Sequence, residues 1–102
     1  MTRNEIENMP AGREMDEQIG YIIYPDAKKY GFIILPNYST NIADAWEIVG
    51  EIPHMKLRDY GERWECEFTP SDPVFGRTAP HAICRAALLS KWMENEPRSA
   101  DR

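Results

Sequence analysis

The sequence predicts a small α+β domain, in which a β-hairpin and a short third strand form an antiparallel sheet packed with three to four helices. Three observations support this prediction. An apolar stripe at helical spacing follows Thr78, apolar and polar residues alternate from His54 to Phe68, and shorter helical segments precede the hairpin. No repeat or linker interrupts residues 1–95, so we expect one domain, followed by a frayed polar tail over residues 96–102.

The segment from Thr78 to Met93 is expected to be the main helix of the core. Thr78 can act as its N-cap, and Pro80 falls in the first turn, where its missing N–H costs nothing. Arg85 interrupts the apolar helix, and its guanidinium needs either a carboxylate or an anionic ligand. The apolar stripe consists of Ala82, Ala86, Leu89 and Met93.

Two helices are expected in the first quarter of the chain. A short one spans Thr2 to Asn8, where Thr2 and Glu5 have the spacing of a capping box. A longer one runs from Pro10 to about Tyr24. Its inward-facing residues should be Ala11, Met15, Ile19, Ile22 and Ile23, with Arg13, Glu14, Asp16 and Glu17 facing elsewhere.

The middle of the chain contains one open assignment and one further helix. The apolar run Phe32–Leu35 is too short to separate a strand from a loop folded onto the core. Ser39 or Thr40 is expected to cap a helix from Asn41 to about Val49. The residues expected to face inward on this helix are Ile42, Ala45, Trp46 and Val49.

The segment from His54 to Phe68 has the pattern of a β-hairpin. Its apolar residues alternate with charged ones, and Asp59–Glu62 supplies the turn. Opposite charges on the polar face suit cross-strand pairing. The segment Val74–Arg77 is expected to add a short third strand.

Composition narrows the function classes. The chain has 102 residues and a net charge of −5, which argues against a nucleic-acid surface rich in Lys and Arg. It contains no apolar run long enough to span a membrane and no secretion-signal pattern, so we expect a cytoplasmic location, in the cytosol. Cys66 and Cys84 are then expected to be reduced and buried.

Several residues have chemistry suited to an anion. Arg13 and Arg85 offer guanidinium forks, and the helix starts at Ser39–Thr40 and Thr78–Ala79 offer free N–H groups. The alternative for the two helix starts is that their free N–H groups bind only water. The candidate ligand-binding residues are Arg13, Ser39, Thr40, Thr78, Ala79, His81 and Arg85.

An internal ion pair with Asp16 or Glu14 is the alternative for Arg85. Metal binding has little support, because His54, Cys66, His81 and Cys84 lack the spacing of a zinc site. His81 and Cys84 do not form a convincing nucleophile pair, and no pair of carboxylates is placed for acid–base work. We therefore expect a protein without enzymatic activity, cofactor or metal.

Three separated parts of the chain resemble the phage ABA sandwich domain family, and together they cover most of residues 1–93. They are Asn8–Asp16, Tyr38–Glu47, and Trp64–Phe68 followed by Thr78–Leu89. The resemblance is specific for the family and not for an activity. It implies an α-β-α sandwich and a small phage-encoded accessory protein. Such proteins often modulate the host or counter its defences, for example by sequestering a nucleotide immune signal in an oligomer.

The first functional hypothesis is a non-enzymatic protein that binds a small anionic, nucleotide-like ligand. The alternative is a protein-interaction module that binds a host or phage protein through exposed acidic faces around Asp44, Glu47 and Glu51. We also expect a homo-oligomer, since a chain of this length builds a nucleotide-sized pocket more easily between subunits than inside one.

Overall fold

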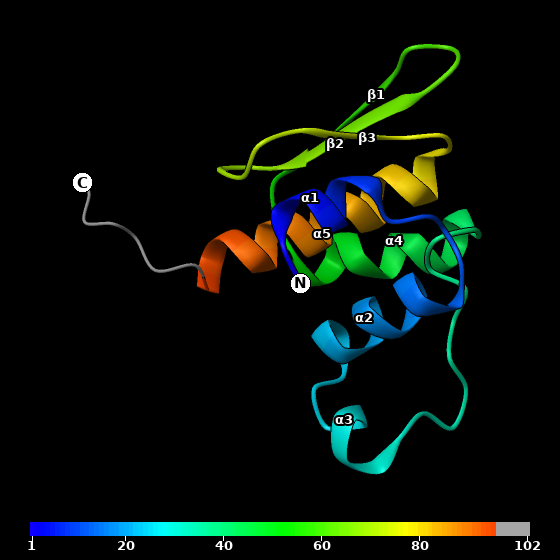
Figure 1. Cartoon of the computed structure of the whole chain (residues 1–102). Helices are drawn as coiled ribbons and strands as arrows, with labels where there is room; N and C mark the ends of the chain where they lie inside the picture. The colour runs from blue at the N-terminus through cyan, green and yellow to red at the C-terminus, as the bar shows by residue number, and fades with distance from the viewer. Residues whose placement is uncertain (96–102) are drawn as a thin grey trace.

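The computed structural model of the chain describes residues 1–95, so the prediction for residues 96–102 lies outside the described residues. Five helices and three strands in this part of the chain confirm the α+β class (Figure 1). In chain order the elements are α1 (Arg3–Asn8), α2 (Arg13–Ile23), α3 (Ala27–Tyr30), α4 (Ile42–Glu51), β1 (Met55–Asp59), β2 (Trp64–Phe68), β3 (Val74–Gly76) and α5 (Ala79–Asn95).

The three strands form one antiparallel sheet in the order β1-β2-β3. Cys66 lies opposite both Leu57 and Val74, so the apolar side chains of the strands share one face. On the other face Arg58 lies opposite Glu65, and their side chains form an ion pair of 2.8 Å. The hairpin, its paired charges and the third strand are therefore confirmed.

Helix α5 packs against the apolar face of the sheet (Figure 1). Thr78 caps it as expected, since its Oγ1 accepts a hydrogen bond from the His81 N–H at 3.3 Å. The end of β3 comes unusually close to this helix start. A Cβ atom built on Gly76 would lie 2.8 Å from the Ala82 Cα atom. Only glycine allows the strand and the helix to meet at this distance.

Helices α1, α2 and α4 pack against α5, and α3 with the loop that follows it projects away from the sheet (Figure 1). The capping box of α1 is present as predicted, with reciprocal hydrogen bonds between Thr2 and Glu5. The core lies where these helices and the sheet meet α5. None of the helices described is both long and apolar enough to cross a membrane.

Helix α2 begins at Arg13 and not at Pro10, because Gly12 takes an N-cap position with φ 149° that suits glycine. Ala11 therefore lies before the helix and is exposed, contrary to the prediction. Met15 and Ile19 are buried as expected. Asp16 was expected to face elsewhere, but it is buried on the same side of the helix.

Helix α4 is capped by Asn41, so the prediction of a Ser39 or Thr40 cap is wrong. The Asn41 Oδ1 accepts a hydrogen bond from the Asp44 N–H at 3.0 Å. The buried side of the helix carries Ala45, Ile48 and, just beyond its end, Ile52. Ile42 and Trp46 lie beside this row and are exposed, which corrects their assignment to the core.

The open assignment at Phe32–Leu35 is resolved as a loop, which follows the short helix α3 that the sequence did not reveal. The Phe32 ring stacks on Tyr21, with 5.3 Å between the ring centroids. It also covers Gly20, where an added Cβ would lie 2.6 Å from the Phe32 Cε1 atom. The loop is therefore anchored to α2 through Phe32, while Ile33 and Ile34 point into solvent.

Cys66 and Cys84 are free thiols and both are buried, as expected. Burial raises the pKa of the Cys66 thiol to about 12 and raises that of Cys84 as well. Both thiols therefore stay protonated at neutral pH, where they pack as small apolar side chains.

Candidate functional site

His81 and Arg85 lie one turn apart on α5, and both bind the same main-chain carbonyl. The Met9 carbonyl is 2.9 Å from His81 Nε2 and 3.0 Å from Arg85 Nε. Met9 ends α1, so these two contacts fix the segment between α1 and α2 to the middle of the core helix. The shared carbonyl explains why two polar residues occur within residues 79–89 of α5, which are otherwise apolar.

The hydrogen bonds of His81 assign it one neutral tautomer. Its Nδ1 accepts a hydrogen bond from the Arg77 N–H at 3.4 Å, so Nε2 carries the proton that it donates to Met9. Burial lowers the pKa of His81, and the neighbouring Arg85 and Arg77 lower it further. His81 is therefore a neutral donor that ties α5 to the Met9 carbonyl in this structure.

Arg85 makes a second contact, from Nη1 to the carbonyl of Phe75 at 2.8 Å. Partial burial lowers the pKa of this guanidinium. Within residues 1–95 Arg85 forms no ion pair. The alternative of an ion pair with Asp16 or Glu14 is therefore wrong, since Arg85 binds main-chain carbonyls.

The Phe75 carbonyl lies at the free edge of the sheet. The Tyr60 N–H donates to the Arg63 carbonyl, and the Thr69 N–H donates to the His54 carbonyl. In an antiparallel ladder every second residue makes such bonds to the same neighbouring strand. The odd-numbered residues of β2 therefore direct their N–H and C=O groups toward β1. Glu65, which is opposite Phe75, is one of them. The N–H and C=O groups of Phe75 consequently point away from β2.

A groove of about 310 Å³ runs along this edge, between β3 and the end of α1. We call it the Arg85 groove, and its lining residues are Glu7, Asn8, Pro73, Val74, Phe75 and Arg85. The Glu7 carboxylate is 2.7 Å from Arg3 Nε, and Arg3 also binds Asp72 at 2.9 Å. Glu7 and Asp72 thus share the positive charge of Arg3, whereas the positive charge of Arg85 has no carboxylate partner among the described residues.

The other predicted site residues lie elsewhere. Arg13 is 76% exposed and pairs with Glu17 on its own helix, at 3.4 Å. Ser39 is buried, and its Oγ donates to Asp16 Oδ1 at 2.7 Å and accepts from the Gly12 N–H at 2.9 Å. Thr40 is exposed beyond this contact. The structure brings together His81 and Arg85, but not these residues with them.

The α5 start is closed rather than open. Thr78 uses its side chain as the cap, and Ala79 is partly buried beside the close approach of Gly76 to Ala82. Ligand binding at Arg13, Ser39, Thr40, Thr78, Ala79 and His81 stays a prediction. In this structure the polar side chains of Arg13, Ser39, Thr78 and His81 contact other groups of the protein.

Sequence reasoning missed the buried contact between Asp16 and Ser39. Asp16 Oδ1 accepts from both the N–H and the Oγ of Ser39, at 2.8 Å and 2.7 Å. One signal was available, because Asp16 falls between Met15 and Ile19 on the buried side of α2. The carbonyls of Met9 and Phe75 carry no such signal, since every residue has one.

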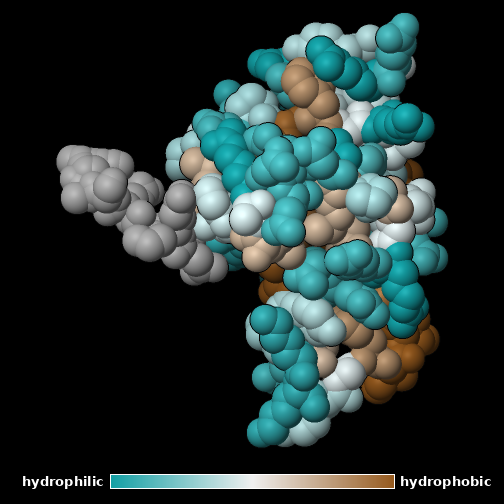
Figure 2. Space-filling view, viewed as in Figure 1, coloured by the Kyte–Doolittle hydropathy of each residue, from teal (hydrophilic) through white to brown (hydrophobic). Residues whose placement is uncertain are grey.

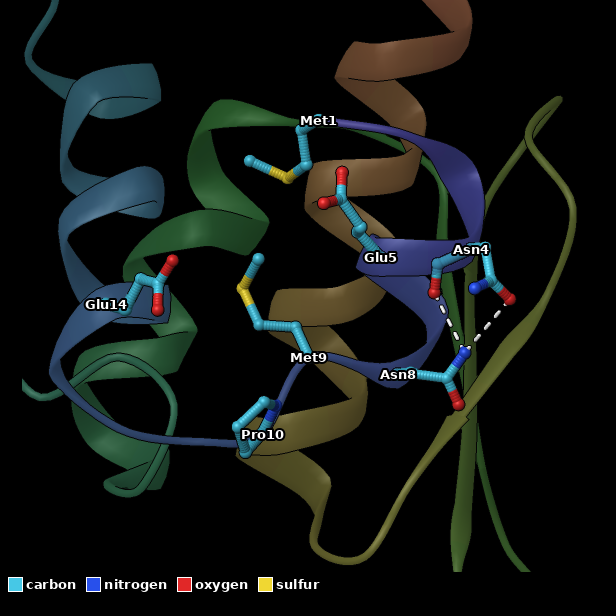
Figure 3. A pocket seen from close by; sticks show the side chains of 7 residues that line it. All are labelled: Met1, Asn4, Glu5, Asn8, Met9, Pro10 and Glu14. Atoms are coloured by element: carbon cyan, nitrogen blue, oxygen red, sulfur yellow. Dashed lines mark hydrogen bonds between the residues drawn. The ribbon is translucent and has the colours of Figure 1, made fainter.

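A second hollow, of about 530 Å³, lies where α1 faces the start of α2 (Figure 3). Glu5 and Glu14 stand on its sides, and Asn8 donates to the main-chain oxygen of Asn4 at 2.8 Å (Figure 3). Carboxylates here would repel an anion. The Arg85 groove is therefore the better place for an acidic ligand.

An exposed apolar surface lies at the opposite end of the molecule from the sheet. Ile33 is fully exposed, Ile34 is 81% exposed and Tyr30 is 77% exposed, with Tyr24 next to them. We call these four residues the apolar surface. They line a hollow of about 340 Å³, and apolar atoms gather over the segment that joins α3 to α4 (Figure 2). Contiguous exposed apolar residues of this kind typically mark contact sites.

No set of three His, Cys, Asp or Glu side chains in the described part of the chain could hold a metal ion. Comparison with protein families gives one match, in which the model of the phage ABA sandwich domain aligns with residues 13–88. No curated protein and no solved structure matches the chain.

Proposed function

The chain belongs to the phage ABA sandwich domain family, and we propose that it is a non-enzymatic phage protein that holds an acidic group of its ligand in the Arg85 groove. The observation that supports this is the guanidinium of Arg85, which lines a groove and forms no ion pair with the described residues. A partly buried cation is stabilised by an anion that joins it.

The geometry of Arg85 suits a planar acidic group. Nε and Nη1 are held by the carbonyls of Met9 and Phe75, which fixes the plane of the guanidinium. Nη2 remains as a donor for a carboxylate or phosphate oxygen. A ligand would therefore meet an oriented donor and would not have to order a flexible side chain.

A nucleotide-like ligand, sequestered during infection as an immune signal of the host, is the finer form of this proposal. Cyclic dinucleotides and ADP-ribose derivatives can be screened by thermal shift. A ligand present at 100 times its Kd stabilises the protein by about 2.7 kcal/mol. Arg85→Lys should weaken binding about tenfold, because lysine keeps the charge but loses the fixed guanidinium plane that orients Nη2.

Arg13→Lys is the matched control, because Arg13 is exposed and lies outside the groove. Equal loss of binding in both variants would place the anion elsewhere. No shift with acidic compounds of any type would overturn the proposed function. Turnover of a bound compound would show that the protein is an enzyme.

The apolar surface supports a second function, contact with another protein. We propose that a second copy of the chain occupies it. The exposed isoleucines and the hollow beside them lie on the same surface, so a two-fold axis lets the side chains of each copy enter the hollow of the other. Light scattering tests this, and a strict monomer at high micromolar concentration would leave the surface to a host or phage protein.

A further inference from the structure

The free edge of β3 has one main-chain donor that is open to a ligand. The Phe75 N–H points away from β2, and the residues that the structure describes offer it no acceptor. On either side the edge is closed to pairing. Pro73 has no N–H, and the Arg77 N–H donates to His81 Nδ1.

Arg85 stops any added strand at a defined point. A strand that paired fully with Phe75 would both accept from its N–H and donate to its C=O. Arg85 Nη1 already binds that carbonyl at 2.8 Å. The main chain of an added peptide can therefore accept a hydrogen bond from the Phe75 N–H, but it cannot donate to the Phe75 carbonyl. At the next position along the edge it meets the Arg85 guanidinium, which binds a carboxylate well.

We propose that the ligand of the Arg85 groove is an extended peptide, whose main chain accepts from the Phe75 N–H and whose C-terminal carboxylate lies on Arg85. This inference rests on the proposed function, an acidic group held by Arg85, and names a peptide in place of a nucleotide-like compound as the ligand class. Strand addition to a sheet edge and capture of a terminal carboxylate are both established modes of peptide recognition.

The walls of the groove fit a peptide better than a nucleobase. The Phe75 ring lies on the outer face of the sheet, where the Arg63 guanidinium sits 3.9 Å from its centroid and Tyr60 packs at 6.0 Å. That ring is thus not available to stack on a base in the groove. The volume of about 310 Å³ is at the small end for ligand pockets, which suits a few residues of extended chain.

The opposite wall supplies acceptors for the N–H groups of such a peptide. The Asn8 amide uses its NH₂ group on Asn4, at 2.8 Å and 3.2 Å, which leaves its own side-chain oxygen to accept. The Glu7 carboxylate lines the same wall and is held by its ion pair with Arg3. The groove therefore offers donors on the β3 side and acceptors on the α1 side.

The test uses the intact protein as the target for selection from a random peptide library whose members have free C-termini. Selected peptides are then synthesised with a free or an amidated C-terminus, and their affinities are measured by calorimetry. We expect amidation to weaken binding at least tenfold, because the amide removes the charge that faces Arg85. Equal binding of both forms would overturn the role of the carboxylate.

A pair of variants tests the strand pairing without touching Arg85. Phe75→Pro removes the outward N–H and no ladder hydrogen bond, while Phe75→Ala loses the same ring and keeps the N–H. The proline variant should bind selected peptides about tenfold more weakly than the alanine variant. Equal affinities would overturn pairing with β3.

The outcomes separate this inference from the proposed function. If no peptide is enriched but an acidic nucleotide gives a thermal shift, the peptide ligand is ruled out and the anion site at Arg85 remains supported. Failure of both peptides and acidic nucleotides would overturn the anion site itself.

Discussion

The Arg85 groove is built on the most enclosed helix of the chain, whereas the apolar surface is carried by a short helix and a loop. Helix α5 packs against the sheet and against three other helices. Helix α3 packs on α2, and the loop after it is anchored mainly by Phe32 over Gly20. Changes at the groove should therefore alter stability and binding together, while changes at the apolar surface should alter association alone.

The largest effect is expected where β3 meets the start of α5. Gly76→Ala places a Cβ 2.8 Å from the Ala82 Cα and should lower the free energy of unfolding by about 3 kcal/mol, because two main chains must separate. Urea unfolding measures this. Gly50→Ala is the control, since nothing lies within 4 Å of its added Cβ on α4, and it should stabilise by about 0.5–1 kcal/mol.

A smaller loss is expected at Arg85. Arg85→Met removes the hydrogen bonds to the Met9 and Phe75 carbonyls and should destabilise by about 2–3 kcal/mol. The exposed Arg13→Met should change stability by less than about 0.5 kcal/mol. Unfolding of the two variants at the same urea concentration would show that the hydrogen bonds of Arg85 to the Met9 and Phe75 carbonyls do not stabilise the fold.

The third prediction uses pH to test the buried contact of His81 with the Met9 carbonyl, next to Arg85. The pKa of His81 is lowered in the folded protein from its ordinary value of 6.5, so the unfolded chain binds the proton more readily. The contribution of neutral His81 is fully present above about pH 6.5 and is lost as the pH falls through the lower folded pKa. His81→Gln should flatten this part of the stability profile.

The control for the pH experiment is His54→Asn, because His54 is exposed and asparagine tolerates its positive φ of 67°. This variant should keep the slope of the parent protein between about pH 7 and 5.5. A parent profile that is flat in that range would contradict the buried donor role of His81.

The periodic elements could be predicted because their signals are local. The capping box at Thr2, the alternation through Cys66 and the apolar face of α5 each depend on residues close in sequence. The predictions of which residues of α2 and α4 face the core were partly wrong, because packing against elements distant in sequence decides which side is buried. Asp16 is buried because Ser39 reaches it from the next segment, and Trp46 is exposed because Ala45 and Ile48 face the core.

Of the predicted site residues, only Arg85 lines the groove. A charge in the apolar part of a helix shows that a partner must exist. Its partners are the main-chain carbonyls of Phe75, in the preceding strand, and of Met9, far away in sequence. Arg13 has the same side chain and ends on the surface, because its helix turns that face to solvent. Side-chain chemistry therefore identified the residue, and only the fold identified the groove.

The smallest effect on stability and the clearest effect on association are expected at the apolar surface. Replacing Ile33 and Ile34 together by serine should change the free energy of unfolding of the monomer by less than about 0.5 kcal/mol, since both side chains are exposed. If a second copy covers them, each loses about 1.5–3 kcal/mol of burial, and the dimer should dissociate at least a hundredfold more readily.

Light scattering and sedimentation over a concentration series measure the dissociation, and urea unfolding of the dilute protein measures the monomer. Ile42→Ser is the control, because Ile42 is an exposed isoleucine on α4 outside the apolar surface and should leave association unchanged. Dissociation by the control as strong as by the double variant would place the interface on α4. A marked loss of monomer stability in the double variant would show that the loop contributes to the core and would remove the contrast with the Arg85 groove.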